Sequence, residues 1–139
     1  PWKFEAGTPV IAQGIALAEA IDYLDDIGME NVQEHEERLA EYAYDRLTEM
    51  DDVDVYGPSP EQGRTGLVAF NLENVHAHDL SSILNDHGVA IRAGDHCTQP
   101  LHDKLGVPAS TRASFYIYNT KEEIDALVDA VDDARQLFA

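Results

Sequence analysis

The sequence Arg92-Ala93-Gly94-Asp95-His96-Cys97-Thr98-Gln99-Pro100-Leu101 contains the only cysteine of the chain. It lies between two apolar runs, Val89–Arg92 and Thr111–Tyr118, that are typical of β-strands. A glycine ahead of the cysteine and a proline after it punctuate a polar segment, which favours a surface loop. We therefore expect residues 93–101 to form an exposed loop that presents Cys97 to solvent.

The neighbours of Cys97 favour a reactive thiol. A thiol reacts as its thiolate, which nearby cations favour; Arg92 and His96 can supply positive charge, whereas Asp95 opposes it. Gly94 gives the backbone the freedom to turn just ahead of the thiol. The alternative is that a lone cysteine is a small buried hydrophobe. Polar neighbours of this kind are uncommon in a core, so we expect the reactive form.

Working outward from the loop, apolar periodicity and turn residues predict the other elements. The expected helices are 10–27, 31–50, 77–87, a short turn at 101–105, and a last helix that opens with a capping box at Thr120 and Glu123. Two further strands are expected at Val53–Tyr56 and Leu67–Leu72. Together these elements predict an α+β fold, in which a small, mainly antiparallel sheet within residues 53–118 is covered by helices.

Length and composition predict one domain over residues 1–139, and the first residues do not have the organisation of a signal peptide. With 44% hydrophobic residues, the chain can bury a real core, but it is short for two domains. A single cysteine excludes an internal disulfide and a cysteine-rich zinc module. No apolar run is long enough to cross a bilayer. We expect a cytoplasmic protein that does not enter a membrane.

The charge is strongly negative, with 27 Asp and Glu against 9 Lys and Arg, a formal net charge of -18. Such a charge repels nucleic acids and anionic membrane surfaces, so neither is an expected partner. The acids recur through the helical segments, as on the surfaces of proteins from high-salt cytoplasms, where screening reduces self-repulsion. An ordinary acidic protein is the alternative. The recurring acids are Asp22, Asp25, Asp26, Glu34, Glu36, Glu37, Glu41, Asp125, Asp129, Asp132 and Asp133.

Three kinds of site compete at the cysteine loop. The first joins a nucleophilic Cys97 to Arg112, fifteen residues later, whose guanidinium can clamp a carboxylate with two hydrogen bonds. The second is a metal site, and the third is a structural or partner-binding module without chemistry. Neither group of possible metal ligands has the spacing of a known site, so we expect no metal. Those groups are Asp95, His96, Cys97 and His102, and His76, His78 and Asp79. Arg112 has its own alternative, a surface cation on a strand.

Near the start of the chain, residues 1–9 are expected to form an extended entry segment. Glu5–Pro9 places a glycine and a hydroxyl beside a proline, which suits contact with a phosphate through backbone and side chain. Thr8 is the candidate phosphate contact. It is also a candidate N-cap for the first helix, and the two roles are compatible.

These motifs resemble the C-terminal part of a PLP-dependent cysteine desulfurase of the SufS type, close to the selenocysteine lyases and within the class V aminotransferases. The resemblance runs over essentially the whole chain, and its specific part is the cysteine loop with Arg112 at the family distance. The matching segments, in family order, are Phe4–Pro9, Tyr56–Pro58, Val68–Leu72, Arg92-x-Gly94-x-His96-Cys97 with Gln99–Leu101, Arg112–Ser114 and Tyr118–Thr120.

The resemblance implies the small domain of a fold-type I PLP-dependent transferase. In that family the loop thiolate, here Cys97, takes the sulfur of L-cysteine as a persulfide and alanine leaves. Arg112 would hold the substrate carboxylate, and Thr8 would reach the cofactor phosphate of the neighbouring subunit in a homodimer. Arg92, Gly94 and His96 would support the loop. The sulfur would pass to a scaffold protein of iron–sulfur cluster assembly.

The sequence departs from the family pattern in two respects. Asp95 stands where family members commonly have a second histidine, and none of the lysines Lys3, Lys104 and Lys121 falls at the motif of the cofactor-binding lysine. The chain alone is therefore expected to be inactive and to need an N-terminal large domain. The remaining alternatives are a selenocysteine lyase, another class V aminotransferase-like enzyme, or a non-catalytic partner-binding module.

Overall fold

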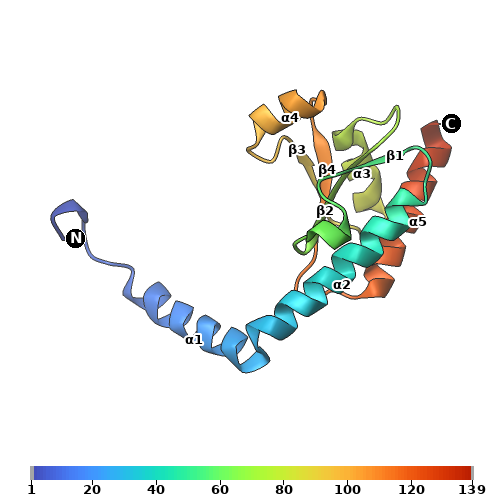
Figure 1. Ribbon diagram of the computed structural model, residues 1–139. Helices are drawn as coiled ribbons and strands as arrows, with labels where there is room; N and C mark the ends of the chain where they lie inside the picture. Colours follow the sequence, from blue (N-terminus) through green and yellow to red (C-terminus); the bar gives the residue numbers. More distant parts are fainter. Residues whose placement is uncertain (1, 139) are drawn as a thin grey trace. The chain divides into compact units, whose positions relative to one another are not determined.

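The computed structural model describes residues 2–138 and shows five α-helices and four strands in that range (Figure 1). The two strands Val53–Tyr56 and Leu67–Leu72 are confirmed residue for residue, and the predicted helices are confirmed within a few residues. The elements are η1 (Trp2–Phe4), α1 (Ile11–Ile27), α2 (Met29–Thr48), β1 (Val53–Tyr56), η2 (Pro60–Gln62), β2 (Leu67–Leu72), α3 (Ala77–Asp86), β3 (Arg92–Gly94), α4 (Gln99–Leu105), β4 (Ser110–Ser114) and α5 (Lys121–Phe138).

The chain divides into two compact units, of which the first ends at Val32 and the second begins at Gln33. The single domain expected over 1–139 stays a prediction. Helix α1 buries none of its side chains. Within the entry segment, Trp2–Phe4 is a short 3-10 turn rather than the expected extended chain. Pro1 and Ala139, the ends of the expected domain, lie outside the described residues.

The second unit holds one four-stranded sheet in the order β1-β2-β4-β3. All three neighbouring pairs are antiparallel, which confirms the predicted sheet type. β4 lies between β2 and β3, so the strand that follows the cysteine loop pairs with the strand that precedes it. The loop is thereby anchored at both of its ends.

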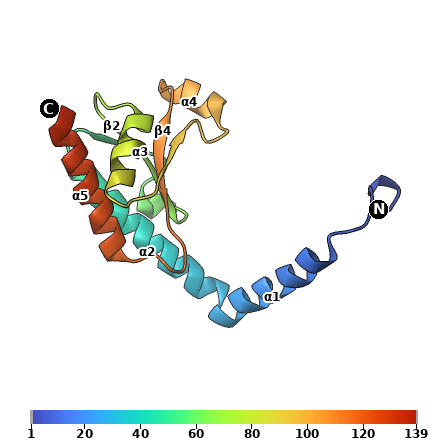
Figure 2. The ribbon, with the colours of Figure 1, turned by 180° about the vertical axis from the view of Figure 1, so that it is seen from behind.

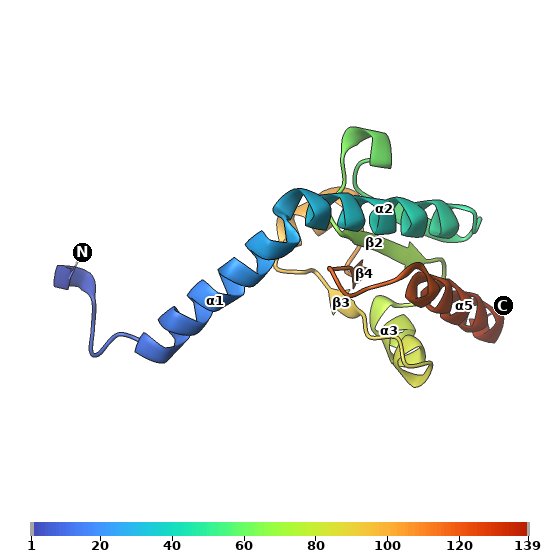
Figure 3. The ribbon, with the colours of Figure 1, turned by 90° about the horizontal axis from the view of Figure 1, so that it is seen from below.

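Helices α2, α3 and α5 cover one face of the sheet (Figures 2 and 3), and their buried apolar residues form one core cluster with buried residues of β1, β2 and β4. In β2, Val68, Phe70 and Leu72 are buried while the residues between them are less so, as the period of two requires. Burying a side chain such as Phe70 contributes about 1.5–3 kcal/mol. This packing confirms the α+β class.

Two strand predictions need correction at their ends. Pairing with β4 begins only at Arg92, so the apolar run Val89–Ile91, expected to be strand, leads into β3 without being part of it. β4 ends at Ser114, four residues before the expected end. One residue further on, the Phe115 amide still donates to the Gly66 carbonyl at 2.6 Å, so the backbones of the two segments stay close just beyond the strand ends. A Cβ at Gly66 would lie 2.8 Å from the Phe115 oxygen, so this approach requires glycine.

The apolar face of the last helix is buried at Ile124, Leu127, Val128 and Val131. Phe138, which was expected on the same face, is half exposed at the end of α5. At its start, the Thr120 amide donates to the Glu123 carboxylate at 3.1 Å, as the predicted capping box requires. Among the described helices, none combines the length and apolar character needed to cross a membrane.

The face of the sheet opposite these helices, here called the open face, positions the site. Tyr56, Ala69, Arg112 and Arg92 are register partners in turn, and so form one row across the four strands. Thr111 and Ala113 are buried on the helix side, so Arg112 between them points to the open face. In Figures 1 and 2 the strands lie between α5 and α4, which places α4 and the cysteine loop across the sheet from α5.

Candidate active site

The cysteine loop is a tight turn built on Asp95. One Asp95 carboxylate oxygen accepts the Cys97 amide at 3.0 Å, and the Asp95 carbonyl accepts both the amide and the hydroxyl of Thr98, at 2.8 and 2.7 Å. Asp95, the departure from the family pattern, therefore shapes the turn. Gly94 enters it with φ of 138°, a value that favours glycine.

His96 and Cys97 both have left-handed backbone conformations, with φ of 51° and 60°. This conformation costs a non-glycine residue energy, about 1–3 kcal/mol, and persists only where surrounding contacts impose it. Two such residues in succession place Cys97 at the exposed tip of the turn. The alternative of a buried, inert cysteine was wrong, because the polar turn leaves the thiol no apolar surroundings.

His96 connects the loop to β4. Its Nε2 lies 3.0 Å from the Ser110 carbonyl oxygen, so Nε2 carries the proton and donates it. Its Nδ1 is buried and has no hydrogen-bond partner among residues 2–138. Burial, together with the positive charge of Arg112, lowers the pKa of His96, while the Ser110 hydrogen bond opposes this. His96 is therefore neutral at neutral pH and holds an unused acceptor.

We predict that His96 titrates below the usual histidine value of about 6.5. The unfolded chain gains this proton near pH 6.5, and the folded chain gains it only at lower pH. The stability contributed by neutral His96 is thus present above pH 6.5 and is lost as pH falls. An NMR titration of the histidine rings, assigned with His96→Asn, measures this; a His96 midpoint at or above 6.5 would contradict it.

Arg112 is the third residue of β4, close to the start of the strand as expected, and is only partly buried. Its Nε is buried without a hydrogen-bond partner among the described residues. Arg92, exposed on β3, is its direct register partner on the open face. Like charges directly opposite one another destabilise a sheet, and an anion between the two guanidiniums would remove that cost.

Thr8 lies in the first compact unit, whereas Cys97 and Arg112 lie in the second. It is exposed and precedes α1. The N-cap of α1 is Val10, without a side-chain cap, so the N-cap role considered for Thr8 is wrong. Gly7 beside it has φ of 76°, which leaves a compact turn with an exposed hydroxyl.

The other candidates from the sequence do not gather into a site. Within residues 2–138, no three His, Cys, Asp or Glu side chains lie close enough together to hold a metal ion. His76 caps α3 by accepting the His78 amide and stacks on the His78 ring. Lys104 is exposed on α4, and Lys121 lies over the Tyr42 ring at the start of α5.

Sequence reasoning considered His102 only as a metal ligand and did not consider Ser110. Both are buried, and the His102 Nε2 lies 3.0 Å from the Ser110 hydroxyl. No sequence pattern signals this pair, because eight residues and a change from helix to strand separate its members.

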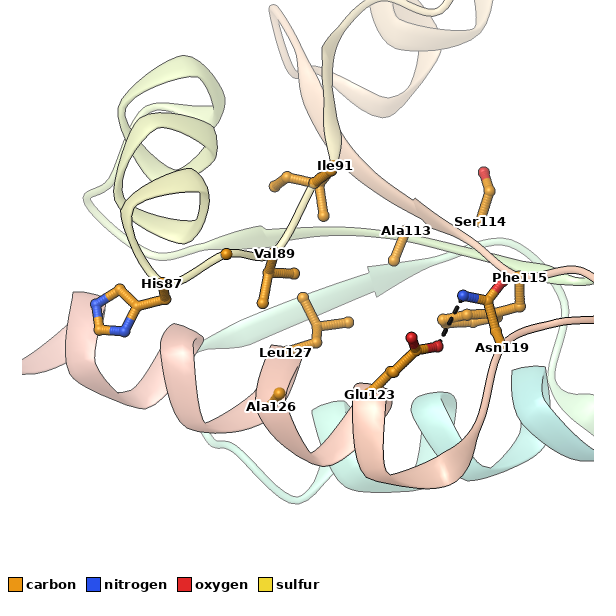
Figure 4. A pocket seen from close by; sticks show the side chains of 12 residues that line it. His87, Val89, Ile91, Ala113, Ser114, Phe115, Asn119, Glu123, Ala126 and Leu127 are labelled. Atoms are coloured by element: carbon orange, nitrogen blue, oxygen red, sulfur yellow. Dashed lines mark hydrogen bonds between the residues drawn. The ribbon is translucent and has the colours of Figure 1, made fainter.

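A separate pocket of about 270 Å³ lies between residues 87–91, the end of β4 and the first turns of α5 (Figure 4). Apolar side chains such as Val89 and Leu127 line it, and Glu123 accepts a hydrogen bond from Asn119 at its edge. Neither Cys97 nor Arg112 belongs to it.

Comparison with known proteins shows which family and which solved structures this chain resembles. The model of the aminotransferase class-V family matches residues 1–127. A cysteine desulfurase of Haloferax volcanii is 78% identical over all 139 residues, and a probable cysteine desulfurase of Halobacterium salinarum is 76% identical. The chain covers 32% and 33% of those two proteins, so it spans about a third of their length.

Solved structures agree. The chain superposes over its whole length on 34% of the cysteine desulfurase CsdA of Escherichia coli, with a TM-score of 0.91 and 40% identity. A cysteine desulfurase of Thermococcus onnurineus gives a TM-score of 0.90 at 37% identity, covering 96% of this chain and 33% of that one.

Proposed function

This chain belongs to the aminotransferase class-V family, and on that premise we propose that it is the C-terminal part of a PLP-dependent cysteine desulfurase. The observation that carries the proposal is the exposed Cys97 at the tip of a constrained loop, whose flanking strands β3 and β4 carry the register partners Arg92 and Arg112. The names of the relatives favour L-cysteine over selenocysteine as substrate. Family membership argues against a non-catalytic module.

Cys97 is the sulfur acceptor in this proposal. Its thiolate forms a bond to the substrate sulfur as the carbon–sulfur bond breaks, which leaves a persulfide on Cys97. The electron pair of the broken bond stays with the substrate carbon, which gains a proton and becomes the methyl group of alanine. An exposed tip suits the next step, in which another protein must reach the persulfide.

Arg112 binds the substrate carboxylate in this proposal. Its Nε is buried and has no partner within the described residues, so the guanidinium is already partly desolvated. Forming a two-pronged pair with a carboxylate therefore costs less further desolvation of Arg112. Arg92, opposite it, adds positive charge in a protein whose net charge is -18. That local charge attracts a carboxylate which the rest of the surface repels.

The cofactor would be held mainly by residues outside this chain, because none of Lys3, Lys104 and Lys121 lies at the cysteine loop or in β4. Thr8 fits a phosphate: its hydroxyl is exposed and its neighbour Gly7 turns the backbone so that amides can join it. When bound, PLP supplies the electron sink for breaking the carbon–sulfur bond.

Four wider proposals accompany this function. The enzyme is a homodimer in which Thr8 contacts the phosphate of the partner's cofactor. Its persulfide passes to a scaffold protein of iron–sulfur cluster assembly. It works in the cytoplasm. Its acidic helices suit a high salt concentration, since none of the eleven helical acids named above is buried and screening would weaken their mutual repulsion.

The test uses the full-length enzyme with its large domain and PLP. After incubation with L-cysteine, mass spectrometry should show that the peptide containing Cys97 gains one sulfur atom, in step with alanine formation. Reduction with dithiothreitol should remove that sulfur as sulfide. Alanine formation without any modification of Cys97 would overturn the proposal.

A further inference from the structure

His102 is a buried histidine beneath the cysteine loop, with only 4% of its surface exposed. It lies on α4, between the end of the loop at Thr98 and the neighbouring strand at Ser110. A buried histidine with both ring nitrogens engaged is fixed in orientation and in tautomer, so its contacts show what it holds.

On the loop side, the His102 Nδ1 lies 3.3 Å from both the carbonyl oxygen and the hydroxyl of Thr98. The Thr98 hydroxyl already donates its one proton to Asp95 at 2.7 Å. Both Thr98 atoms therefore face Nδ1 as acceptors. It follows that Nδ1 carries the ring proton.

On the strand side, the neutral His102 ring has only a lone pair left at Nε2. The Ser110 hydroxyl, 3.0 Å away, must therefore donate to it. The carbonyl of the same Ser110 accepts from His96 Nε2, also at 3.0 Å. Ser110 is thus a bridge between the two histidines, whose ring centres are 5.8 Å apart.

The chain of contacts links both ends of the strained turn to β4. Asp95 and Thr98 close the turn, His102 ties Thr98 to Ser110, and Ser110 ties back to His96. Left-handed residues such as His96 and Cys97 keep their conformation only when neighbouring contacts impose it. His102 is the only buried histidine among the described residues, and it supplies the central link.

We propose that His102 is a positioning residue for Cys97: through Thr98 and Ser110 it holds the turn that aims the thiol. The inference rests on the proposed sulfur-acceptor role of Cys97. His102 moves no proton and does not touch the substrate. Removing it loosens the position of the sulfur, while the open face that binds the carboxylate keeps its register.

The experiment compares three variants of the full-length PLP enzyme. His102→Asn keeps a donor near Thr98, His102→Gln keeps a group near Ser110, and His102→Leu keeps neither. For His102→Leu we expect kcat for alanine formation to fall roughly 10–100-fold, the usual range for lost supporting contacts and small misplacements. The KM for L-cysteine should stay within about twofold. Each of the other two variants should retain part of the rate.

A second readout, NMR of the histidine rings, uses the wild-type protein. With histidine labelled by ¹⁵N, the ring correlations should show the proton on Nδ1 of His102 and on Nε2 of His96. The opposite tautomer at His102 would overturn the proposal. This measurement can overturn the proposal even if His102→Leu does not fold.

Controls separate a positioning role from a general loss of stability. His78→Gln, on the exposed side of α3, should leave kcat and KM unchanged. If His102→Leu lowers Tm but keeps the wild-type kcat, His102 is merely structural and the inference is wrong. The proposed function fails separately, if Cys97→Ser keeps full activity. Equal losses in kcat and in carboxylate binding would also contradict the inference, since Arg112 would then have moved.

Discussion

Replacing Cys97 by serine in the full-length enzyme should lower alanine and sulfide production from L-cysteine by at least about a thousandfold, as expected when a covalent nucleophile is lost. The hydroxyl occupies nearly the same place, but it is a far weaker nucleophile than a thiolate at neutral pH. Because Cys97 is exposed, the substitution disturbs no core contact. Stability should therefore remain close to that of the wild type.

The control for this variant is its cofactor chemistry. Cys97→Ser should still bind PLP, and L-cysteine should still change the cofactor's absorbance, because neither step needs the acceptor thiol. In the native wild-type enzyme, iodoacetamide should label Cys97 readily and block turnover. Normal turnover by Cys97→Ser, or labelling of wild-type Cys97 only after denaturation, would show that the sulfur goes elsewhere.

Replacing Arg112 by lysine should raise the KM for L-cysteine roughly 10–100-fold. The charge remains, but the planar fork is lost, and a charge-assisted hydrogen bond is worth about 1.5–3 kcal/mol, with 1.4 kcal/mol per tenfold in affinity. The effect should be large here because the Arg112 Nε is buried and lacks a partner within the described chain. Steady-state kinetics over a wide range of L-cysteine concentrations measures it.

Arg135→Lys is the matched control for Arg112→Lys. Arg135 is an exposed cation on α5 that pairs with Asp52 and Asp132, so the same exchange there should leave KM unchanged. Iodoacetamide should label Cys97 in Arg112→Lys about as fast as in the wild type. The reason is that the exposure of the thiol does not depend on substrate binding at Arg112. An unchanged KM in Arg112→Lys would mean that Arg112 is only a surface cation.

The His96 and His102 results complement these two variants. Cys97→Ser removes the proposed sulfur acceptor, and Arg112→Lys should weaken binding of the substrate carboxylate. The His102 variants should alter only the position of the thiol. We expect the His102 variants to change kcat but not KM, and Arg112→Lys to change KM. That pair of results would assign positioning of the thiol to the loop and binding of the carboxylate to the open face.

The sequence by itself determined the elements whose signals are local. β2 was predicted to the residue because Leu67–Leu72 is a short apolar run bounded by turn residues. The α+β class followed from the order of such elements. A turn around Cys97 was also readable, since its glycine and polar residues indicate a turn in any context. The expected loop over 93–101 was too long, because residues 93–94 belong to β3 and residues 99–101 to α4.

Only the tertiary structure decided which residues face one another across the sheet and beneath the loop. Arg92 and Arg112 are 20 positions apart in the sequence, yet they are register partners because β4 pairs with β3. The strand at Val89–Ile91 was overpredicted because apolar character says that a segment is buried, not that a partner strand lies beside it. His102, Ser110 and His96 form one hydrogen-bonded chain, although each belongs to a different element. Hydrogen bonds between elements depend on how those elements pack, and no local pattern in the sequence encodes that packing.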